Sequence, residues 1–435
     1  MSDWKFETKQ LHSGWNNDPQ TGATSLPIYM TSSYAFADAD QAANRFALKE
    51  DGYVYSRLMN PTNGVVEERL AALEGGAGAL LVSSGQSAST LSILNLGGVG
   101  KNIIASPSMY GGTTALLNNS LSRVGVETRY VKDPNDPQEW SKLADKDTIA
   151  FYGETIPNPQ GDIFDIEKIA EAAHAVGVPL IVDNTVATPY LVRPIEWGAD
   201  IVIHSGTKYL TGHGTLIAGV IIDAGKFDYA NGRFPYFTEP EAAYHGLVYS
   251  ALDKRKEGGS NLAYIARARS MGLRDFGFAL SPFNAFLIEQ GLQTLSLRVD
   301  RHTSNALAVA EYLEKRGSQV EGVQYAGLKS SKFHALQQKY SPKGASGLLS
   351  FEISGGLEAG KAFINALELL PIVANIGDAK SLAIHPASTM HSQLTESELL
   401  ASGVKPGTVR LSVGIEHIDD IIADLERGFA AAKKV

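Results

Sequence analysis

Seven short apolar runs alternate with helix-like stretches between residues 61 and 270. The runs are GALLVSSG, NIIAS, VETRYV, TIAFYGET, PLIVDNT, DIVIHSGT and LIAGVIID. Helical patterns such as PTNGVVEERLAALEG (61–75) and DIEKIAEAAHAVG (165–177) lie between them. Strands that are apolar throughout are buried on both faces, and helices between them are typical of a mainly parallel sheet. The pattern therefore predicts an α/β fold.

Three regions follow from the same pattern, as expected for 435 residues, a length that favours more than one domain. Residues 1–60 carry turn formers and aromatic residues without sustained periodicity, which predicts an N-terminal arm that packs on other surface. Residues 61–280 form the large domain, with an excursion at 223–275, rich in Gly, Tyr, Phe and charge, interpreted as inserted surface. Residues 281–435 form a smaller C-terminal α/β domain, which begins with a long helical pattern (281–317) and has strands near GLLSFEI and TVRLSVG.

Composition narrows the class of protein. The formal net charge is -9 and the sequence pI is about 5.6, which disfavours a nucleic-acid partner because phosphate binding rests on basic surface. No window approaches the ~20 apolar residues of a membrane span, and the N-terminal residues MSDWKFETKQL lack the apolar core of a signal peptide. We expect a cytoplasmic enzyme with no membrane partner.

The chain has no cysteine, which excludes disulfides, zinc–thiolate sites, iron–sulfur clusters and thiol nucleophiles together. The spacing of His204, His213 and His385 matches no metal signature, so no metal site is predicted. Nucleophilic or acid–base chemistry must then come from Lys, His, Tyr, Ser, Asp or Glu.

Polar residues follow several of the predicted strands. Asp183 follows Ile181 and Val182, and Lys208 comes shortly after the strand that ends near Ser205. In an open α/β sheet the ligand lies at the carboxyl ends of the strands, so these groups should meet at one edge. SSGQSA (83–88) occupies an earlier strand-to-helix junction, where free N–H groups form an anion site. An anion site, an acid and a lysine are the groups that pyridoxal 5′-phosphate (PLP) requires.

Each of these residues also has an ordinary explanation. A lysine after a strand is usually on the surface, SSGQSA is a common helix start, and Asp183 could cap a helix. The prediction rests on their joint placement. Two hypotheses that assign the chain to other classes of protein stay open here: a lysine Schiff-base aldolase without cofactor, and a catalytically inactive binding protein.

The segment 182–214, VDNTVATPYLVRPIEWGADIVIHSGTKYLTGHG, resembles the signature of the Cys/Met-metabolism PLP-dependent enzymes. The resemblance extends, in order along nearly the whole chain, through YSRLMNPT, EGG, SSGQSA, YGGT, HPAS and VRLSVGIEHIDD. It implies the PLP-dependent transferase type I fold, with PLP as cofactor.

The resemblance also implies roles for individual residues. Lys208 would form the Schiff base with PLP, and Asp183 would pair with the pyridine nitrogen. Gly85 and Gln86, through backbone N–H groups, would bind the phosphate together with Ser205 and Thr207. The remaining roles are Tyr110 stacking on the ring and assisting proton transfer, Asn158 at the ring hydroxyl, and Asn375 and Arg410 at the substrate, the guanidinium binding its carboxylate.

Tyr55 and Arg57 of YSR would reach the phosphate of a neighbouring subunit. The resemblance therefore implies a homo-oligomer, a tetramer built from dimers that share active sites. The N-terminal arm fits such an assembly.

Three features favour the sulfhydrylase branch of the family: YGGT, the segment ANIGDAKSLAIHPASTMHSQL (374–394) and the excursion at 223–275. Gly112 and Asn375 stand where lyases carry cysteine and serine. The implied reaction is a γ-replacement that converts O-acetylhomoserine and sulfide into homocysteine and acetate, a step of methionine biosynthesis. The alternatives are a cystathionine γ-synthase, which takes cysteine, or a related γ-lyase, and the acyl group and the thiol stay open.

Overall fold

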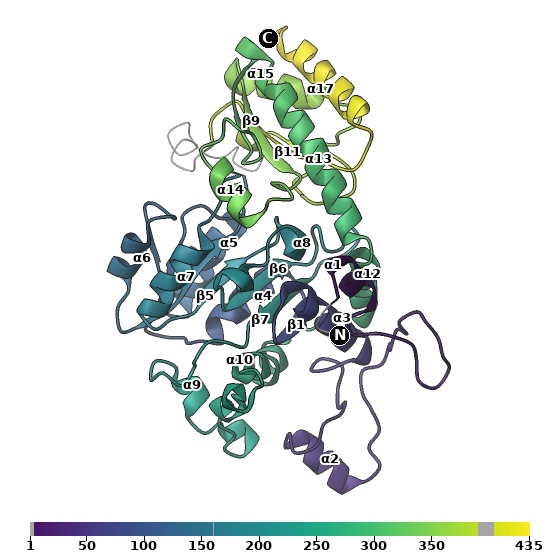
Figure 1. The fold of residues 1–435 in the computed structure, drawn as a ribbon, viewed down its shortest axis with the longest axis vertical. Coiled ribbons are helices and arrows are strands. Elements are labelled where there is room, and N and C mark those ends of the chain that lie inside the picture. Colours follow the sequence, from purple (N-terminus) through teal and green to yellow (C-terminus); the bar gives the residue numbers. More distant parts are fainter. Residues whose placement is uncertain (1–3, 160, 390–403) are drawn as a thin grey trace.

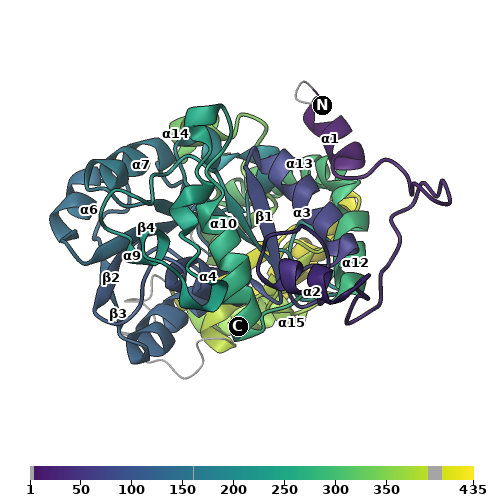
Figure 2. The same cartoon turned by 90° about the horizontal axis from the view of Figure 1, so that it is seen from below.

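The computed structural model of the protein describes residues 4–159, 161–389 and 404–435. Two units lie along its long axis, a larger one with the N-terminal segment and a smaller one that ends at the C-terminus (Figure 1). The N-terminal segment carries two short helices, α1 (Phe6–His12) and α2 (Ala39–Phe46). The chain between them loops away from the large unit in two perpendicular views (Figures 1 and 2).

The large unit is built on a sheet with the strand order β1-β7-β6-β5-β4-β2-β3. Neighbours from β6 to β3 pair in parallel, whereas β7 runs antiparallel to both β6 and β1. The mainly parallel α/β sheet predicted from the sequence is therefore confirmed. Its strands are β1 (Gly78–Val82), β2 (Lys101–Ala105), β3 (Val126–Tyr130), β4 (Thr148–Glu154), β5 (Leu180–Asp183), β6 (Ile201–Ser205) and β7 (Gly219–Asp223).

Both faces of the inner strands are buried, which explains why those strands are largely apolar, whereas β3, at the edge of the sheet, buries only Val126. Along β1, Leu81 belongs to one hydrophobic cluster, and its neighbours Leu80 and Val82 belong to the other. Helices α3 (Pro61–Glu74) and α7 (Ile166–Ala175) contribute to the first cluster. Helices α4 (Gly85–Leu94) and α10 (Ala263–Arg267) contribute to the second.

The excursion at 223–275 differs from the expected surface insert. Six of its aromatic side chains are buried and belong to the second cluster: Phe227, Tyr229, Phe234, Phe237, Tyr249 and Tyr264. The interpretation as plain surface was wrong for these residues, because they pack together with α4 against one face of the sheet. Besides the short helix α9 (Pro235–Thr238), the excursion forms a continuous helical run from α10 to α11 (Arg274–Phe276), which ends one residue beyond it.

The long helical pattern at 281–317 is two helices, α12 (Pro282–Leu292) and α13 (Leu295–Glu314). They lead into a second sheet, entirely antiparallel, with the order β10-β11-β9-β8. The strands near GLLSFEI and TVRLSVG are β9 (Leu348–Ile353) and β11 (Thr408–Ser412), and the pattern missed β8 (Val320–Gln324) and β10 (Leu382–Ile384). Helices α14 (His334–Tyr340), α15 (Gly356–Asn365) and α17 (Ile418–Ala432) complete this unit.

Three further short helices connect strands of the large sheet: α5 (Gly111–Ala115), α6 (Pro137–Leu143) and α8 (Thr188–Leu191). Among the described residues, no helix combines the length and the apolar character that crossing a membrane requires. In the same ranges, no three His, Asp or Glu side chains gather as they would around a metal ion.

Candidate active site

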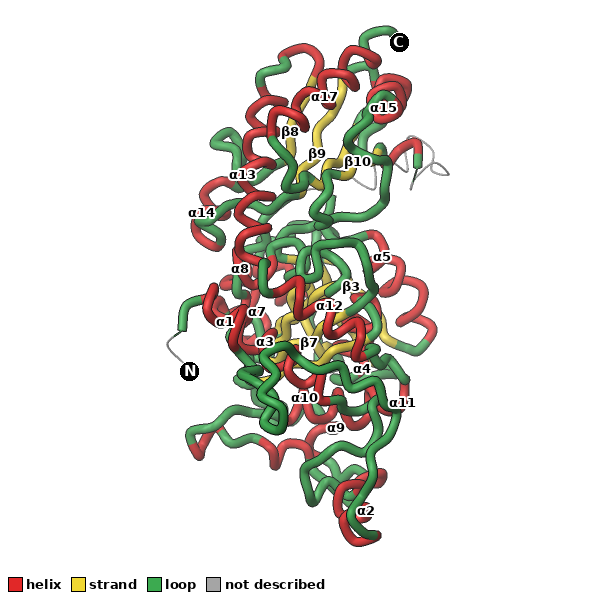
Figure 3. Tube along the Cα trace, turned by 90° about the vertical axis from the view of Figure 1, so that its right-hand side faces the viewer, coloured by secondary structure: helices red, strands yellow, loops and turns green. Residues whose placement is uncertain are grey.

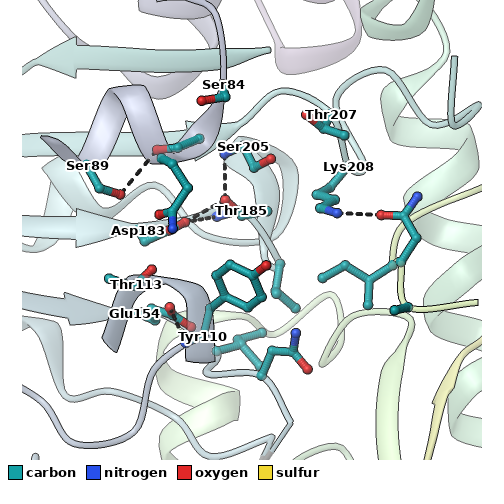
Figure 4. Close-up of a pocket in the computed structure, with 18 of the residues that line it drawn as sticks. Ser84, Ser89, Tyr110, Thr113, Glu154, Asp183, Thr185, Ser205, Thr207 and Lys208 are labelled. Carbon is teal, nitrogen blue, oxygen red and sulfur yellow. Dashed lines mark hydrogen bonds between the residues drawn. The ribbon is translucent and has the colours of Figure 1, made fainter. Parts of the chain in front are cut away.

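One cavity of about 340 Å³ opens at the carboxyl edge of the large sheet. Because β5 and β6 are parallel neighbours, Asp183 and Ser205 end their strands at the same edge. The cavity is also lined by residues of the small unit (Figure 4). Its walls are Ser84, Gly85, Gln86, Ser89, Tyr110, Thr113, Glu154, Ile156, Asn158, Asp183, Thr185, Val186, Ser205, Thr207, Lys208, Ile217, Ala374, Asn375, Ile376 and Arg410.

The first turn of α4 presents to this cavity the groups that the predicted anion site requires. Ser84 caps the helix, because its hydroxyl accepts the Ser87 N–H at 3.0 Å. The N–H groups of the first turn have no partner within the helix, and they carry the positive end of its dipole. A Cβ at Gly85 would lie 2.8 Å from Ser205 Cβ, so only glycine lets this turn approach β6 so closely.

Hydroxyl groups from the turn after β6 face the same place. The Ser205 hydroxyl forms no hydrogen bond within the described part of the chain, whereas its N–H donates to Thr185 Oγ1 at 2.7 Å. The Thr207 hydroxyl is held by Ala218, whose N–H donates to it at 3.0 Å. Of these two hydroxyls, that of Ser205 is thus available to a ligand beside the helix terminus, whereas that of Thr207 is already engaged.

Asp183 presents one carboxylate oxygen to the cavity. Its Oδ1 accepts hydrogen bonds from the N–H and the hydroxyl of Thr185, and the N–H lies 2.9 Å away. Its Oδ2 takes no hydrogen bond from any residue that the structure describes. Burial raises the pKa of the Asp183 carboxyl, while the two bonds from Thr185 oppose that rise. A cation at Oδ2 would favour the charged form of this carboxyl further.

Lys208 lies across the cavity from Asp183, in the turn after β6 (Figure 4). Its Nζ donates to Asn375 Oδ1 of the small unit. Burial lowers the pKa of the Lys208 amine, and the positive charge of Arg410 lowers it further. A lysine in this setting is easier to deprotonate than one on the surface, which is what a nucleophile or a base needs.

Three further predicted residues line the cavity. Arg410, on β11, donates from Nη1 to Asn158 Oδ1 at 3.2 Å and from Nη2 to the Asn375 carbonyl at 3.3 Å. Its Nε is buried without a hydrogen-bond partner among the described residues. Burial lowers the pKa of Arg410 to about 10. Tyr110, which is 51% exposed, also lines the cavity.

Tyr55 and Arg57 do not belong to this cavity. They line a different hollow together with other residues of the N-terminal arm. Within its own chain Arg57 donates to the Arg274 carbonyl, and its guanidinium lies 5.5 Å from the Tyr55 ring centroid. One chain alone thus brings together ten of the twelve predicted residues. Residues 390–394 of the predicted segment 374–394 lie outside the described ranges.

Two contacts in the cavity were missed from the sequence. Glu154 ends β4 and accepts the Tyr110 N–H on Oε1 at 2.7 Å, and the Asn158 N–H also donates to it. Burial and the charge of Asp183 raise the pKa of Glu154, and the two N–H donors oppose that rise. The Gln86 side chain donates from Nε2 to the Gly112 carbonyl at 2.8 Å, so its amide is used as well as its backbone. Glu154 could have been found, because it follows an apolar run just as Asp183 does.

An anion site, a free carboxylate oxygen and a buried lysine, gathered in a cavity of this volume, fit the phosphate, the ring nitrogen and the aldehyde of PLP. The fold and the site together define the class of PLP-dependent enzymes of fold type I.

Comparison with known proteins gives the family. A family model described as Cys/Met metabolism PLP-dependent enzyme matches residues 7–430. The chain is 52% identical to O-acetyl-L-homoserine sulfhydrylase of Leptospira meyeri, over 98% of this chain and 96% of that protein. It is 50% identical to O-acetyl-L-homoserine sulfhydrylase of Corynebacterium glutamicum, over 98% of this chain and 97% of that protein. The protein belongs to the Cys/Met metabolism family of PLP-dependent enzymes.

A solved structure agrees with this assignment. The crystal structure of a Campylobacter jejuni protein, assigned as an O-acetylhomoserine (thiol)-lyase, carries N′-pyridoxyl-lysine-5′-monophosphate. It superposes on this chain with a TM-score of 0.92 at 42% identity, and covers 98% of this chain and 100% of that one. The cofactor of this enzyme is therefore PLP.

The contacts of Glu154 lead to a first prediction. Glu154→Ala should lower kcat by about 10²-fold, because displacing a ring or a backbone segment by about 1 Å is enough for such a loss. Glu154→Gln should retain more activity, since its amide oxygen still accepts the Tyr110 N–H. Steady-state kinetics of the three proteins measures this, with the cofactor absorbance and the thermal midpoint as controls for folding. Normal kcat in Glu154→Ala would show that Tyr110 does not need this support.

Proposed function

We propose that this enzyme catalyses a γ-replacement in which sulfide takes the place of acetate on O-acetylhomoserine and gives homocysteine. The observation that carries the proposal is the placement of Arg410 and Lys208 in one cavity at the carboxyl edge of the sheet. That arrangement suits an amino acid whose carboxylate binds the guanidinium while its Cα faces the amine. The names of the similar proteins support the same reaction.

We assign the cofactor contacts as follows. The first turn of α4, with Gly85 and Gln86, binds the phosphate group together with Ser205 and Thr207. Asp183 Oδ2 accepts a hydrogen bond from the protonated ring nitrogen. Lys208 holds the aldehyde carbon, Tyr110 packs on the ring, and Asn158 contacts the ring hydroxyl. When bound, PLP supplies an electron sink for a carbanion at Cα.

The protein's own groups then perform the remaining tasks. Arg410 binds the substrate carboxylate and fixes the amino acid in one orientation. Lys208, once its amine is released, removes the proton from Cα and subsequently carries a proton from Cβ. Its lowered pKa favours the neutral amine that this role requires. Asn375, whose Oδ1 accepts a hydrogen bond from Lys208, orients the amine between these steps.

The decisive assay compares substrates in parallel. O-acetylhomoserine and O-succinylhomoserine are each combined with sulfide, cysteine and methanethiol, and the products are measured at steady state. The proposal expects O-acetylhomoserine with sulfide to give the highest kcat/KM. Preference for cysteine would instead identify a cystathionine γ-synthase. Release of ammonia and an oxo acid without any thiol would identify a γ-lyase.

The shared active site is part of the proposal. Arg57 and Tyr55 lie outside the cavity of their own chain, and the arm that carries them exposes large apolar side chains such as Met30 (69%) and Phe46 (64%). Both facts support an arm that lies on a second subunit, where Arg57 binds the partner's cofactor phosphate. Assembly as a tetramer of such dimers, and the cytoplasmic location, stay predictions.

Mixing two inactive variants tests the shared site. Arg57→Ala and Lys208→Ala damage different parts of it, so a heterodimer of the two contains one site with both defects and one intact site. Under conditions that exchange subunits, activity should recover to about a quarter of the wild-type value after random pairing, because a symmetric dimer repeats each interface contact twice. Turnover before and after mixing measures the recovery.

The control mixes Lys208→Ala with Arg410→Ala. Both residues line the cavity of the same chain, so every site in that heterodimer stays defective and no recovery is expected. Subunit exchange is shown independently by mass-tagged chains. If Arg57→Ala alone is strongly impaired and the exchanged mixture is no more active than its parents, the shared site is ruled out.

A further inference from the structure

A second cavity, of about 750 Å³, lies where three distant parts of the chain meet. Helix α1 and the residues before it form one wall, the segment from α8 to Trp197 forms another, and the end of α14 forms the third. Figure 3 shows α1, α8 and α14 on the same side of the molecule. None of its lining residues belongs to the active-site cavity.

The walls of this cavity are strongly basic, although the whole chain carries a formal net charge of -9. The cations are Lys5, Lys9, Arg193, Lys339 and Lys343, and the acid among the lining residues is Glu196.

Two of these cations already have partners. Arg193 pairs with Glu196 at 2.7 Å, and Lys339 pairs with Glu167 at 2.7 Å. Lys5, Lys9 and Lys343 form no ion pair with any residue that the structure describes. Three cations without carboxylate partners thus face one hollow, which is the electrostatic arrangement of a site for a multiply charged anion.

Lys343 shows most clearly that a cation of this cavity lacks a close counter-charge. Its ammonium lies 3.7 Å from the centroid of the Tyr190 ring and 5.8 Å from that of Phe6. Partial burial lowers the pKa of Lys343, and the charge of Arg193 lowers it further, against the opposing charges of Glu7 and Asp300. A bound anion would supply the close counter-charge that this ammonium lacks.

Aromatic side chains provide a further part of the wall. Phe6 and Tyr190 pack edge to face at 5.1 Å, as do Trp197 and Tyr340 at 4.8 Å. Trp4, at the mouth, is 38% exposed. Aromatic rings of this kind are surfaces on which a planar ligand ring stacks.

We propose that this cavity binds a nucleoside polyphosphate, whose base packs against the aromatic wall and whose phosphates lie among Lys5, Lys9 and Lys343. Basic and aromatic groups together select a molecule that carries both a planar ring and several negative charges. Its binding would join α1 to α8 and to the end of α14. Helix α8 follows Asp183 and Val186 of the active site by only a few residues, so the ligand would lie next to the segment that holds the ring nitrogen of PLP.

The test uses the PLP-loaded enzyme, without divalent cations, and titrates it with ATP, adenosine and inorganic tripolyphosphate. Two of the four tryptophans of the chain, Trp4 and Trp197, line the cavity, so binding should change the tryptophan fluorescence. Calorimetry gives an independent affinity. ATP is expected to bind saturably, and adenosine alone or tripolyphosphate alone is expected to bind at least about tenfold more weakly.

A matched pair of double variants locates the site. Lys9→Met with Lys343→Met removes two cations of the cavity, and Lys146→Met with Lys434→Met removes two exposed cations elsewhere. The cavity variant should weaken ATP binding by about tenfold or more, and the control variant should change it little. The cofactor absorbance, which reports the separate active site, should be unchanged in both. Absence of saturable ATP binding, equal loss in both variants, or tripolyphosphate binding as tightly as ATP would each overturn the proposal.

Discussion

Lys208→Ala is expected to fold and bind PLP but to lose its covalent attachment and almost all turnover. The phosphate contacts proposed at α4 and the contact proposed at Asp183 are independent of this side chain, so the cofactor is expected to keep a site. Loss of a general base alone costs about 10²-fold to 10⁴-fold, and we propose that the same residue also holds the aldehyde. Reduction with borohydride followed by peptide mapping, together with kcat, measures both effects.

The control for this variant is Lys380→Ala. Lys380 is exposed and belongs to the same segment as Asn375, yet it does not line the cavity. It should keep both the borohydride-stable label at Lys208 and normal kcat. A label on any lysine other than Lys208 in the wild-type enzyme would refute the assignment.

Asp183→Asn should have the second largest effect. The variant is expected to keep the fold and the covalent cofactor, because neither depends on the charge of this carboxyl. A neutral amide cannot hold the ring nitrogen protonated, so removal of the substrate Cα proton should slow by about 10²-fold to 10³-fold, the usual cost of losing one preorganised electrostatic contact. Exchange of the Cα proton with deuterium, followed by NMR, reports this step directly.

The matched control is Asp378→Asn, which removes a carboxylate near the cavity but not from its lining. It should leave the exchange rate close to that of the wild type. A near-normal rate in Asp183→Asn would mean that the ring nitrogen does not depend on this residue. The cofactor absorbance of the variant distinguishes that outcome from a simple loss of cofactor.

Much of the fold was predictable because the apolar runs that mark the strands are a local property of the sequence. Each of the seven strands of the large sheet coincides with a run singled out in the sequence. The inner strands are apolar because a strand covered on both faces cannot carry polar residues at alternate positions, whereas the edge strand β3 leaves Glu127 exposed. Asp183 and Lys208 were placed together for a related reason. They follow neighbouring parallel strands, and the carboxyl ends of such strands meet at one edge.

Other features were not local and were missed. Helices α12 and α13 are separated by Gln293 and Thr294. Neither of these is glycine or proline, so the sequence predicts one continuous helix. The aromatic residues of 223–275 looked like surface because nothing near them in sequence showed that the second face of the sheet lacked a cover. The hydrogen bond from the Tyr110 N–H to Glu154 joins residues that are 44 positions apart in the sequence.

The sequence by itself determined the α/β class, the strands of the large sheet, the anion site at α4 and the pairing of Asp183 with Lys208 at one edge. These follow from residues adjacent in the chain and from the fixed geometry of parallel strands. Only the tertiary structure decided that Asn375 reaches Lys208, 167 positions away, and that Arg410 reaches Asn158, 252 positions away. It also decided that Arg57 lies outside the active-site cavity of its own chain, and that Lys5, Lys9 and Lys343 line a second cavity. Such contacts depend on how whole units pack, and packing is set by the sum of many buried surfaces rather than by any local run of residues.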